Sequence, residues 1–137
     1  MLESTLREAY ACIELPTGWA WGWDGRFGAA LLVIRPTVAN QFQECLRRYF
    51  DQVWNHQMLT MLPPDVHGLV NLLDGIRAGQ NVYTKNIEDS LTLWSSWWPW
   101  SGNSHISVRL GIHCQDLSPE RLSEAQHKVR SIFTQTL

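Results

Sequence analysis

Two segments of the chain have apolar patterns that predict β-strands. In residues 19–35, two apolar runs flank Asp24-Gly25, and the second run is apolar on both faces near its end. This dipeptide is typical of tight hairpin turns, because both positions tolerate a positive φ. In residues 105–114, apolar side chains fall on one face and five others on the opposite face. These five are His105, Ser107, Arg109, Gly111 and His113. The pattern predicts a hairpin over 19–35 and a further strand over 105–114.

Helical spacing of apolar residues predicts the helices. The clearest stripe covers residues 38–61, and at 1.5 Å per residue a helix of this length would measure about 36 Å. Ser118-Pro119 is a strong start signal for a C-terminal helix over 119–135, because serine caps a helix and proline fits its first position. Shorter helices are expected near the N-terminus and in the middle of the chain. We expect the sheet to pack against the long central helix 38–61 and the C-terminal helix.

Residues 87–98 fit two kinds of secondary structure. A stripe of Ile87, Leu91, Trp94 and Trp98 favours a helix. The threonine and tryptophan content of the same segment suits a strand that pairs with the next one. The helix is preferred here, and the strand is kept as the alternative.

Length and element order define the expected architecture. A chain of 137 residues falls within the usual size of one domain. The strands and helices do not alternate regularly, which favours a small antiparallel sheet with helices packed on it. We therefore expect residues 1–137 to form a single α+β domain.

Charge and cysteine content narrow the choice of partners. The net charge is −2, whereas nucleic acids and anionic membranes are normally bound by a basic face. The longest clean apolar run, 29–34, is far shorter than the ~20 residues needed to span a bilayer. Three widely spaced cysteines (Cys12, Cys45 and Cys114) are an odd number, which favours free thiols in a reducing compartment. We expect a cytoplasmic protein that binds neither nucleic acid nor membranes.

The polar face of strand 105–114 is the one candidate for a ligand site. Arg109 with His105 or His113 could hold an anion, and a histidine could serve as a general acid or base. Alternate residues on a strand are about 6.6 Å apart, so the two histidines would lie about 26 Å apart and cannot share one substrate atom. His113 and Cys114 point to opposite faces and cannot bind one metal ion together. Because the chain also lacks the usual metal-binding motifs, no metal or cofactor is expected.

Eight tryptophans are the strongest anomaly in the composition. Four of them lie within seven residues: Trp94, Trp97, Trp98 and Trp100. In a helix or a strand these four indoles point in more than one direction, so they cannot all enter one core. Exposed aromatic patches usually mark interaction surfaces, and tryptophan is enriched at binding hot spots. We expect the region around 94–100 to form a binding surface.

Other aromatic and apolar positions support a division between core and surface. Trp19 and Trp21 are expected opposite the small residues Ala30 and Gly28 in the hairpin, where they would be packed in the core. By contrast, Trp54 and Met58 leave the apolar stripe of the predicted long helix. These two side chains are expected to belong to the binding surface.

The sequence thus favours a binding protein over an enzyme. The principal hypothesis is a small protein-binding module, such as an adaptor, secretion chaperone, toxin-neutralising protein or inhibitor, with another protein as partner and a homodimer as an included case. The alternative is a small enzyme or an anion- or ligand-binding domain that uses the strand face around Arg109 and His113.

Overall fold

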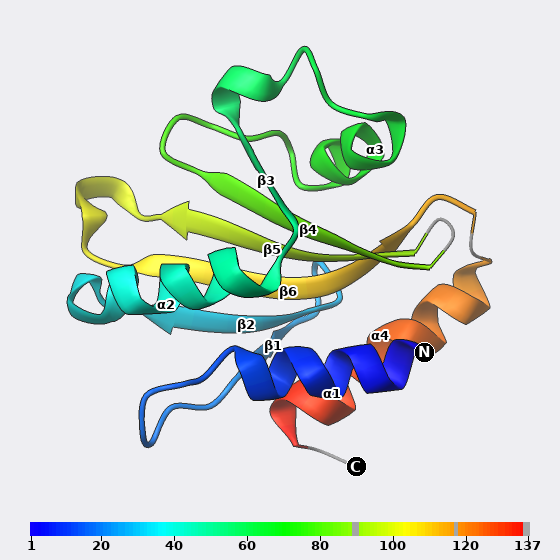
Figure 1. Ribbon diagram of the computed structural model, residues 1–137, viewed down its shortest axis with the longest axis horizontal. Coiled ribbons are helices and arrows are strands. Elements are labelled where there is room, and N and C mark those ends of the chain that lie inside the picture. Colours follow the sequence, from blue (N-terminus) through cyan, green and yellow to red (C-terminus); the bar gives the residue numbers. More distant parts are fainter. Residues whose placement is uncertain (89–90, 117, 136–137) are drawn as a thin grey trace.

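The computed structural model describes residues 1–88, 91–116 and 118–135. Within these ranges, six strands form one antiparallel sheet in the order β1-β2-β6-β5-β4-β3 (Figure 1). The strands are β1 (Gly22–Asp24), β2 (Ala29–Ile34), β3 (Gln52–Asn55), β4 (Asn81–Glu88), β5 (Leu91–Pro99) and β6 (Ile106–Cys114). The helices are α1 (Leu2–Cys12), α2 (Pro36–Tyr49), α3 (Pro64–Leu72) and α4 (Pro119–Thr134), with short 3₁₀ turns at His56–Met58 and Ser101–Asn103. The predicted α+β class is confirmed.

Helices α1, α2 and α4 cover one face of the sheet and form the larger core with it. Their fully buried side chains include Leu6 of α1, Leu46 of α2 and Val129 of α4, which meet strand residues such as Leu93 and Val108. Helix α4 begins at the predicted position, where the Ser118 hydroxyl accepts a hydrogen bond from the Arg121 N–H at 3.2 Å. This cap satisfies one of the free N–H groups at the helix start.

The opposite face of the sheet is covered only in part. Helix α3 and the segments beside it form a second, smaller core around Val82 and Trp94. Trp94 lies over Gly111 of the neighbouring strand, where a Cβ atom would come within 2.8 Å of the indole. The absence of a side chain at Gly111 therefore makes room for the indole. No helix of the described residues covers the rest of this face.

The expected long helix over 38–61 is wrong beyond Tyr49. Helix α2 ends there, and residues 52–55 form the edge strand β3, paired with β4 through Val53↔Tyr83 and Trp54↔Val82. Apolar residues at positions 49, 50 and 53 fit a helical stripe, but valine and tryptophan also suit a strand. Pairing with β4 decides between the two, and it leaves Val53 42% exposed instead of buried.

The preferred helix over 87–98 is also wrong for the residues of this range that the structure describes, which are in strands: 87–88 end β4 and 91–98 belong to β5, while 89–90 lie outside the described residues. Residues 91–99 form β5, which lies between β4 and β6. Leu93 and Trp97 enter the larger core, while Trp94 enters the smaller one. A central strand is apolar on both faces, and such a strand shows no clean alternation in the sequence. The tryptophan content was the better guide to its structure.

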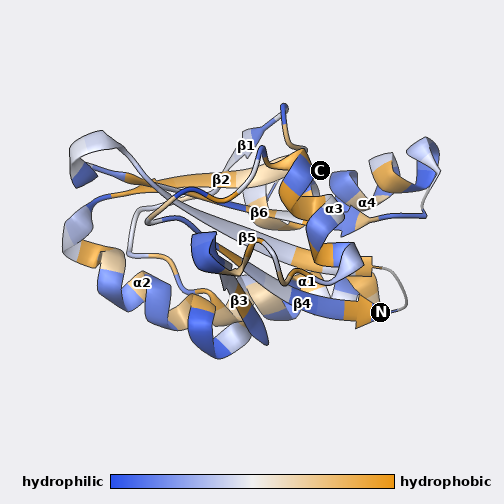
Figure 2. Cartoon of the chain, turned by 90° about the horizontal axis from the view of Figure 1, so that it is seen from above, coloured by the Kyte–Doolittle hydropathy of each residue, from blue (hydrophilic) through white to orange (hydrophobic). Residues whose placement is uncertain are grey.

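The predicted hairpin is present with a longer turn. Its register pairs Trp23 with Ala30 and Asp24 with Ala29, so the turn is wider than two residues. The offset from the predicted register is even, and the side chains keep their expected faces. Trp21 is 4% exposed in the core, as expected, and Trp19 is half-buried against it. Figure 2 shows β2 as apolar along its length, which fits its position between two other strands.

Candidate interaction surface

The uncovered part of the second sheet face carries aromatic, apolar and charged side chains together. We name it the Trp98–Arg109 face. It consists of Leu31, Val33, Trp98, Trp100, Ser107 and Arg109. The strand register places the first members side by side, because Leu31 pairs with Arg109, Val33 with Ser107, and Trp98 with Ser107. Val33 is 40% exposed and Trp100 is 46% exposed. An open sheet face with such residues is unusual, since large exposed apolar groups normally mark interaction sites.

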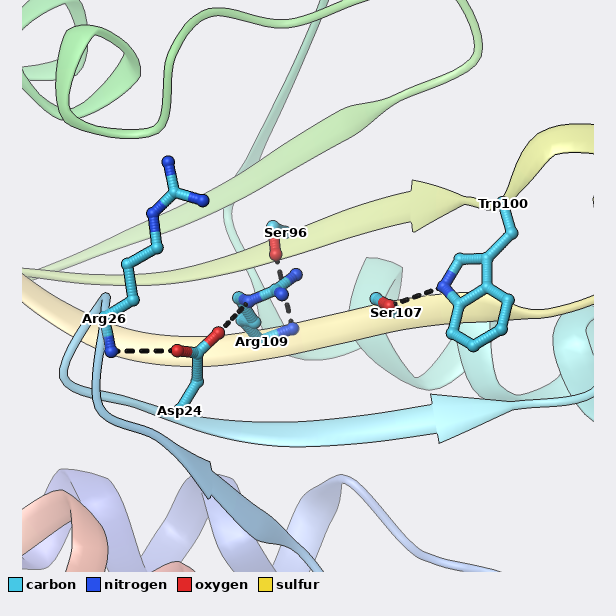
Figure 3. Close-up of polar contacts among 6 residues, drawn as sticks. All are labelled: Asp24, Arg26, Ser96, Trp100, Ser107 and Arg109. Atoms are coloured by element: carbon cyan, nitrogen blue, oxygen red, sulfur yellow. Dashed lines mark hydrogen bonds and ion pairs between the residues drawn. The ribbon is translucent and has the colours of Figure 1, made fainter.

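Arg109 lies at the centre of this face and is held from several sides. Its Nε donates to the Asp24 Oδ2 at 2.7 Å (Figure 3). Its guanidinium carbon lies 4.6 Å from the ring centroid of Trp98 and 5.3 Å from that of Phe27. The Arg109 side chain is only 15% exposed. These contacts fix the guanidinium between two aromatic rings, an arrangement that cation–π attraction stabilises.

Two buried donors at this site have no hydrogen-bond partner among the described residues. They are the Nη1 of Arg109 and the Nε1 of Trp98. Most buried polar groups in proteins are paired, so an unpaired donor is costly. Neither donor atom is accessible to solvent, so each is a destabilising feature of this face in the described part of the chain.

Asp24 is tuned by the same contacts. Desolvation alone would raise the pKa of its carboxyl, but the Arg109 guanidinium and the backbone N–H groups of Arg26 and Phe27 outweigh that effect. The pKa of Asp24 therefore lies below its ordinary value. The carboxyl accepts from the Arg26 N–H at 2.9 Å with its other oxygen. Asp24 thus ties the turn after β1 to strand β6.

Trp100 is fixed at the other end of the face. Its indole Nε1 donates to the Ser107 Oγ at 2.8 Å (Figure 3). Its ring centroid lies 4.7 Å from that of His105. The indole is therefore oriented although nearly half of its surface is exposed. A fixed, exposed aromatic side chain loses little conformational entropy on binding. This property is typical of binding hot spots.

The predicted surface residues are divided between core and surface. Trp94 is 3% exposed and Trp97 is 5% exposed, so the expectation that these two are exposed is wrong. Strand alternation directs them into the two opposite cores. Trp98 is half-buried and Trp100 is exposed, and both lie on the uncovered face. Their role in binding stays a prediction.

Trp54 and Met58 lie outside the predicted helix. Trp54 is on β3, half-buried against the smaller core, and its Nε1 donates to the Thr84 Oγ1 at 2.9 Å. Its register places it in one cross-strand row with Val82, Ser96 and Arg109. Strand β4 separates β3 from β5, so Trp54 packs against the smaller core and not on the Trp98–Arg109 face. Met58 is half-buried in the 3₁₀ turn that follows β3.

The three residues of the alternative ligand site, Arg109, His113 and His105, do not lie together in one pocket. The side chains of His113 and Arg109 point the same way from β6, as predicted from the alternation. However, His113 is 8% exposed, and a Cβ added at Gly68 of α3 would lie 3.5 Å from its Nε2. Burial lowers the pKa of His113, against the opposing charge of Asp65. His105 instead lies beside Trp100. The three residues therefore occupy three different surroundings.

Two residues of this face, and two others that contact Arg109, were not predicted from the sequence. Asp24 was read as a turn residue, and Phe27, Leu31 and Val33 as hairpin residues without a further role. Asp24 and Arg109 are 85 positions apart, and no local pattern links them. The alternation of Leu31 and Val33 opposite the core face was the available signal for this second apolar surface.

Comparisons with other proteins do not assign the chain to a group. The chain matches no known protein family, and neither curated proteins nor solved structures give a significant match. In the described ranges, no cluster of three or more His, Cys, Asp or Glu side chains could hold a metal ion. None of the helices described is long and apolar enough to cross a membrane. The fold is that of an α+β protein. Helices cover one face of its sheet, and the other face only in part.

Proposed function

We propose that this protein is a small protein-binding module that engages another protein through the Trp98–Arg109 face. The observation that carries the proposal is the uncovered sheet face beside α3, where Trp98, Trp100, Val33 and Arg109 lie together. Tryptophan and arginine are the residue types most enriched at interface hot spots. An adaptor, a secretion chaperone, a toxin-neutralising protein or an inhibitor would use such a face.

The state of Arg109 favours a protein partner over an anion or an enzyme substrate. Asp24 already occupies its Nε at 2.7 Å and neutralises its charge. Such a pair attracts a free anion weakly. By contrast, the exposed apolar surface of Val33 and Trp100 can be buried by the surface of a partner protein.

The cytoplasm is the compartment that we propose for this interaction. Cys12, Cys45 and Cys114 are all free, and they differ in exposure. Free thiols persist in a reducing compartment.

Site-specific photocrosslinking in cells tests the proposal. A benzophenone amino acid replaces Val33 on the proposed face, and in a matched control it replaces Arg48 of α2, whose side chain is 76% exposed. We expect a discrete cross-linked protein from position 33 that is absent from position 48. With the purified partner, Trp100→Ala should weaken binding about ten-fold or more.

Other outcomes would overturn the proposal. Identical products from both positions would show that the face is not selective. Cross-linking only to a second copy of the chain would replace the heterologous partner with a homodimer. Unchanged affinity of the Trp100→Ala variant would remove the face from the interaction.

A further inference from the structure

The outer edge of β2 is only partly paired. Strand β1 pairs with residues 29–31 of β2, whereas β2 continues to Ile34. The Leu31 carbonyl oxygen faces β1, since it lies 3.5 Å from the position that a Cβ at Gly22 would take. In an antiparallel sheet, residues two apart on a strand direct their main-chain groups to the same neighbouring strand. The N–H and C=O of Val33 therefore point to this edge at a place where β1 has no residue.

The chain before β1 does not pair with this open edge. The segment that joins α1 to β1 loops out from the sheet (Figure 1). Trp21, next to β1, turns to the helical face, where its ring centroid lies 6.2 Å from that of Phe42 and 5.4 Å from that of Phe133. No backbone hydrogen bond in the described ranges joins residues 15–21 to Val33. The side chain of Val33 is 40% exposed, so the open edge and the Trp98–Arg109 face meet at this residue.

A cation follows directly on this edge. Arg35 has an extended backbone, with φ −91° and ψ 154°, so the alternation of β2 continues and places Arg35 on the same face as Val33. Its side chain is exposed and has no ion-pair partner among the described residues. Helix α2 begins at the next residue, and its N-terminus adds positive potential that no acidic residue in its first turn offsets. This corner of the face therefore favours an acidic group from outside.

We infer that the partner contributes an extended segment, which pairs with the main chain of Val33 and places a carboxylate at Arg35. Addition of a strand to an open sheet edge is a common mode of peptide recognition. In antiparallel pairing, the residue opposite Arg35 comes two positions before the residue opposite Val33. The segment thus carries Asp or Glu, then any residue, then an apolar residue that covers Val33. This inference rests on the proposed function, because it names the part of the partner that engages the face.

Three synthetic peptides test the inference by NMR on the full-length protein. The acidic peptide is acetyl-Thr-Glu-Thr-Val-Thr-amide, and the basic peptide has lysine in place of glutamate. The third is the acidic peptide with a methyl group on the valine nitrogen, which removes the N–H that would donate to the Val33 carbonyl. We expect saturable shifts of the Val33 amide with the acidic peptide, with a dissociation constant of about 1 mM, since ordering a short peptide is costly. The basic peptide should bind about five-fold more weakly, as expected for an exposed ion pair, and the methylated peptide should give no saturable shift.

The Arg35→Gln variant separates the charge from the strand edge. It keeps a polar side chain of similar shape, and the preference for the acidic peptide should fall below about two-fold. The matched control is Arg48→Gln on α2, because Arg48 is 76% exposed and lies away from the edge. This control should keep the five-fold preference. With the partner that cross-linking identifies, Arg35→Gln should weaken binding about three-fold.

Each contrary result would overturn the inference. Equal binding of the acidic and basic peptides would remove the role of Arg35. Equal binding of the methylated peptide would show that the segment does not pair as a strand, and no saturable shift with any peptide would remove the edge site. If Trp100→Ala weakens binding of the identified partner while Arg35→Gln does not, the extended segment is rejected and the proposed function stands.

Discussion

Asp24 and Arg109 form an ion pair that crosses a strand. Asp24 is on β1 and Arg109 on β6, and β2 lies between these strands in the sheet. The two side chains are 14% and 15% exposed, respectively, and their contact is 2.7 Å long. The pair therefore joins the edge strand of the sheet to a central strand across β2, in which Ala29 is the cross-strand neighbour of Asp24 and Leu31 that of Arg109. It also sets the position of the guanidinium on the proposed binding face.

Asp24→Asn should destabilise the fold, because it leaves the guanidinium buried without its counter-charge. We expect a loss of about 2–3 kcal/mol in the free energy of unfolding, somewhat less than for a fully buried pair. Urea denaturation measures it. The matched control is Asp74→Asn, which breaks the exposed Arg26–Asp74 pair and should cost less than about 1 kcal/mol. Equal losses in the two variants would contradict the structural role of the Asp24–Arg109 pair.

The same pair predicts a dependence of stability on acid. The folded-state pKa of Asp24 lies below the ordinary 3.8, so the folded state holds the proton less readily than the unfolded state. The resulting stabilisation is complete above pH 3.8 and is lost as the pH falls through the lower folded-state value. Unfolding free energies of the wild type and Asp24→Asn should converge between pH 6 and pH 2.5. A constant difference over this range would be the contrary result.

His113 predicts a second pH dependence at higher pH. Burial holds its folded-state pKa below the ordinary 6.5, although the charge of Asp65 opposes this effect. The unfolded state therefore takes up a proton that the folded state resists, and stability decreases as the pH falls below 6.5. The difference in unfolding free energy between pH 7.5 and pH 5.5 should be smaller in His113→Phe than in the wild type. An equal difference would show that His113 titrates normally.

Truncation of a buried tryptophan and of an exposed one should reduce the free energy of unfolding by different amounts. Trp97→Ala removes a buried indole from the larger core and should cost about 3–5 kcal/mol. Trp100→Ala removes a half-exposed indole with one hydrogen bond to Ser107 and should cost about 1 kcal/mol. Thermal or urea unfolding distinguishes the two. Comparable losses would contradict the assignment of Trp100 to the surface.

Gly111→Ala tests the contact between β6 and Trp94. The added Cβ would lie 2.8 Å from the indole carbon Cζ2, closer than carbon atoms approach. The ring or the strand must shift, and we expect a loss of about 1–3 kcal/mol. Gly25→Ala is the control, because nothing lies within 4 Å of its added Cβ. A near-neutral effect at Gly111 would show that Trp94 can move aside freely.

The parts of the fold that depend on local signals were predictable from the sequence. Strand β6 and the capped helix α4 occupy almost the predicted residues, because alternation and the Ser118-Pro119 start signal are local. The wide turn after β1 was not predicted, because Asp24 uses its side chain to accept from Arg26 and to bind Arg109. The second of these contacts is made over a long range.

Strands that are set by their neighbours were not predictable in the same way. Residues 52–55 and 91–99 are strands because β4 and β6 pair with them. In both segments the apolar positions also fit a helix. The sequence predicted that a tryptophan-rich segment would contribute to the candidate surface. It did not predict which tryptophans lie on that surface, because the direction of each indole depends on how its strand pairs.

The edges of the sheet have a consequence for the behaviour of the protein in concentrated solution. The two outer strands, β1 and β3, have three and four residues and are the shortest of the described sheet. Unpaired main-chain groups at a long edge invite a strand from another chain and start aggregation. Here the tryptophan-bearing β5 is internal and is paired with β4 on one side and β6 on the other, and each outer strand itself offers room for very few hydrogen bonds. The chain can therefore carry a heavy load of β-forming aromatic residues without presenting them as a template for its own copies.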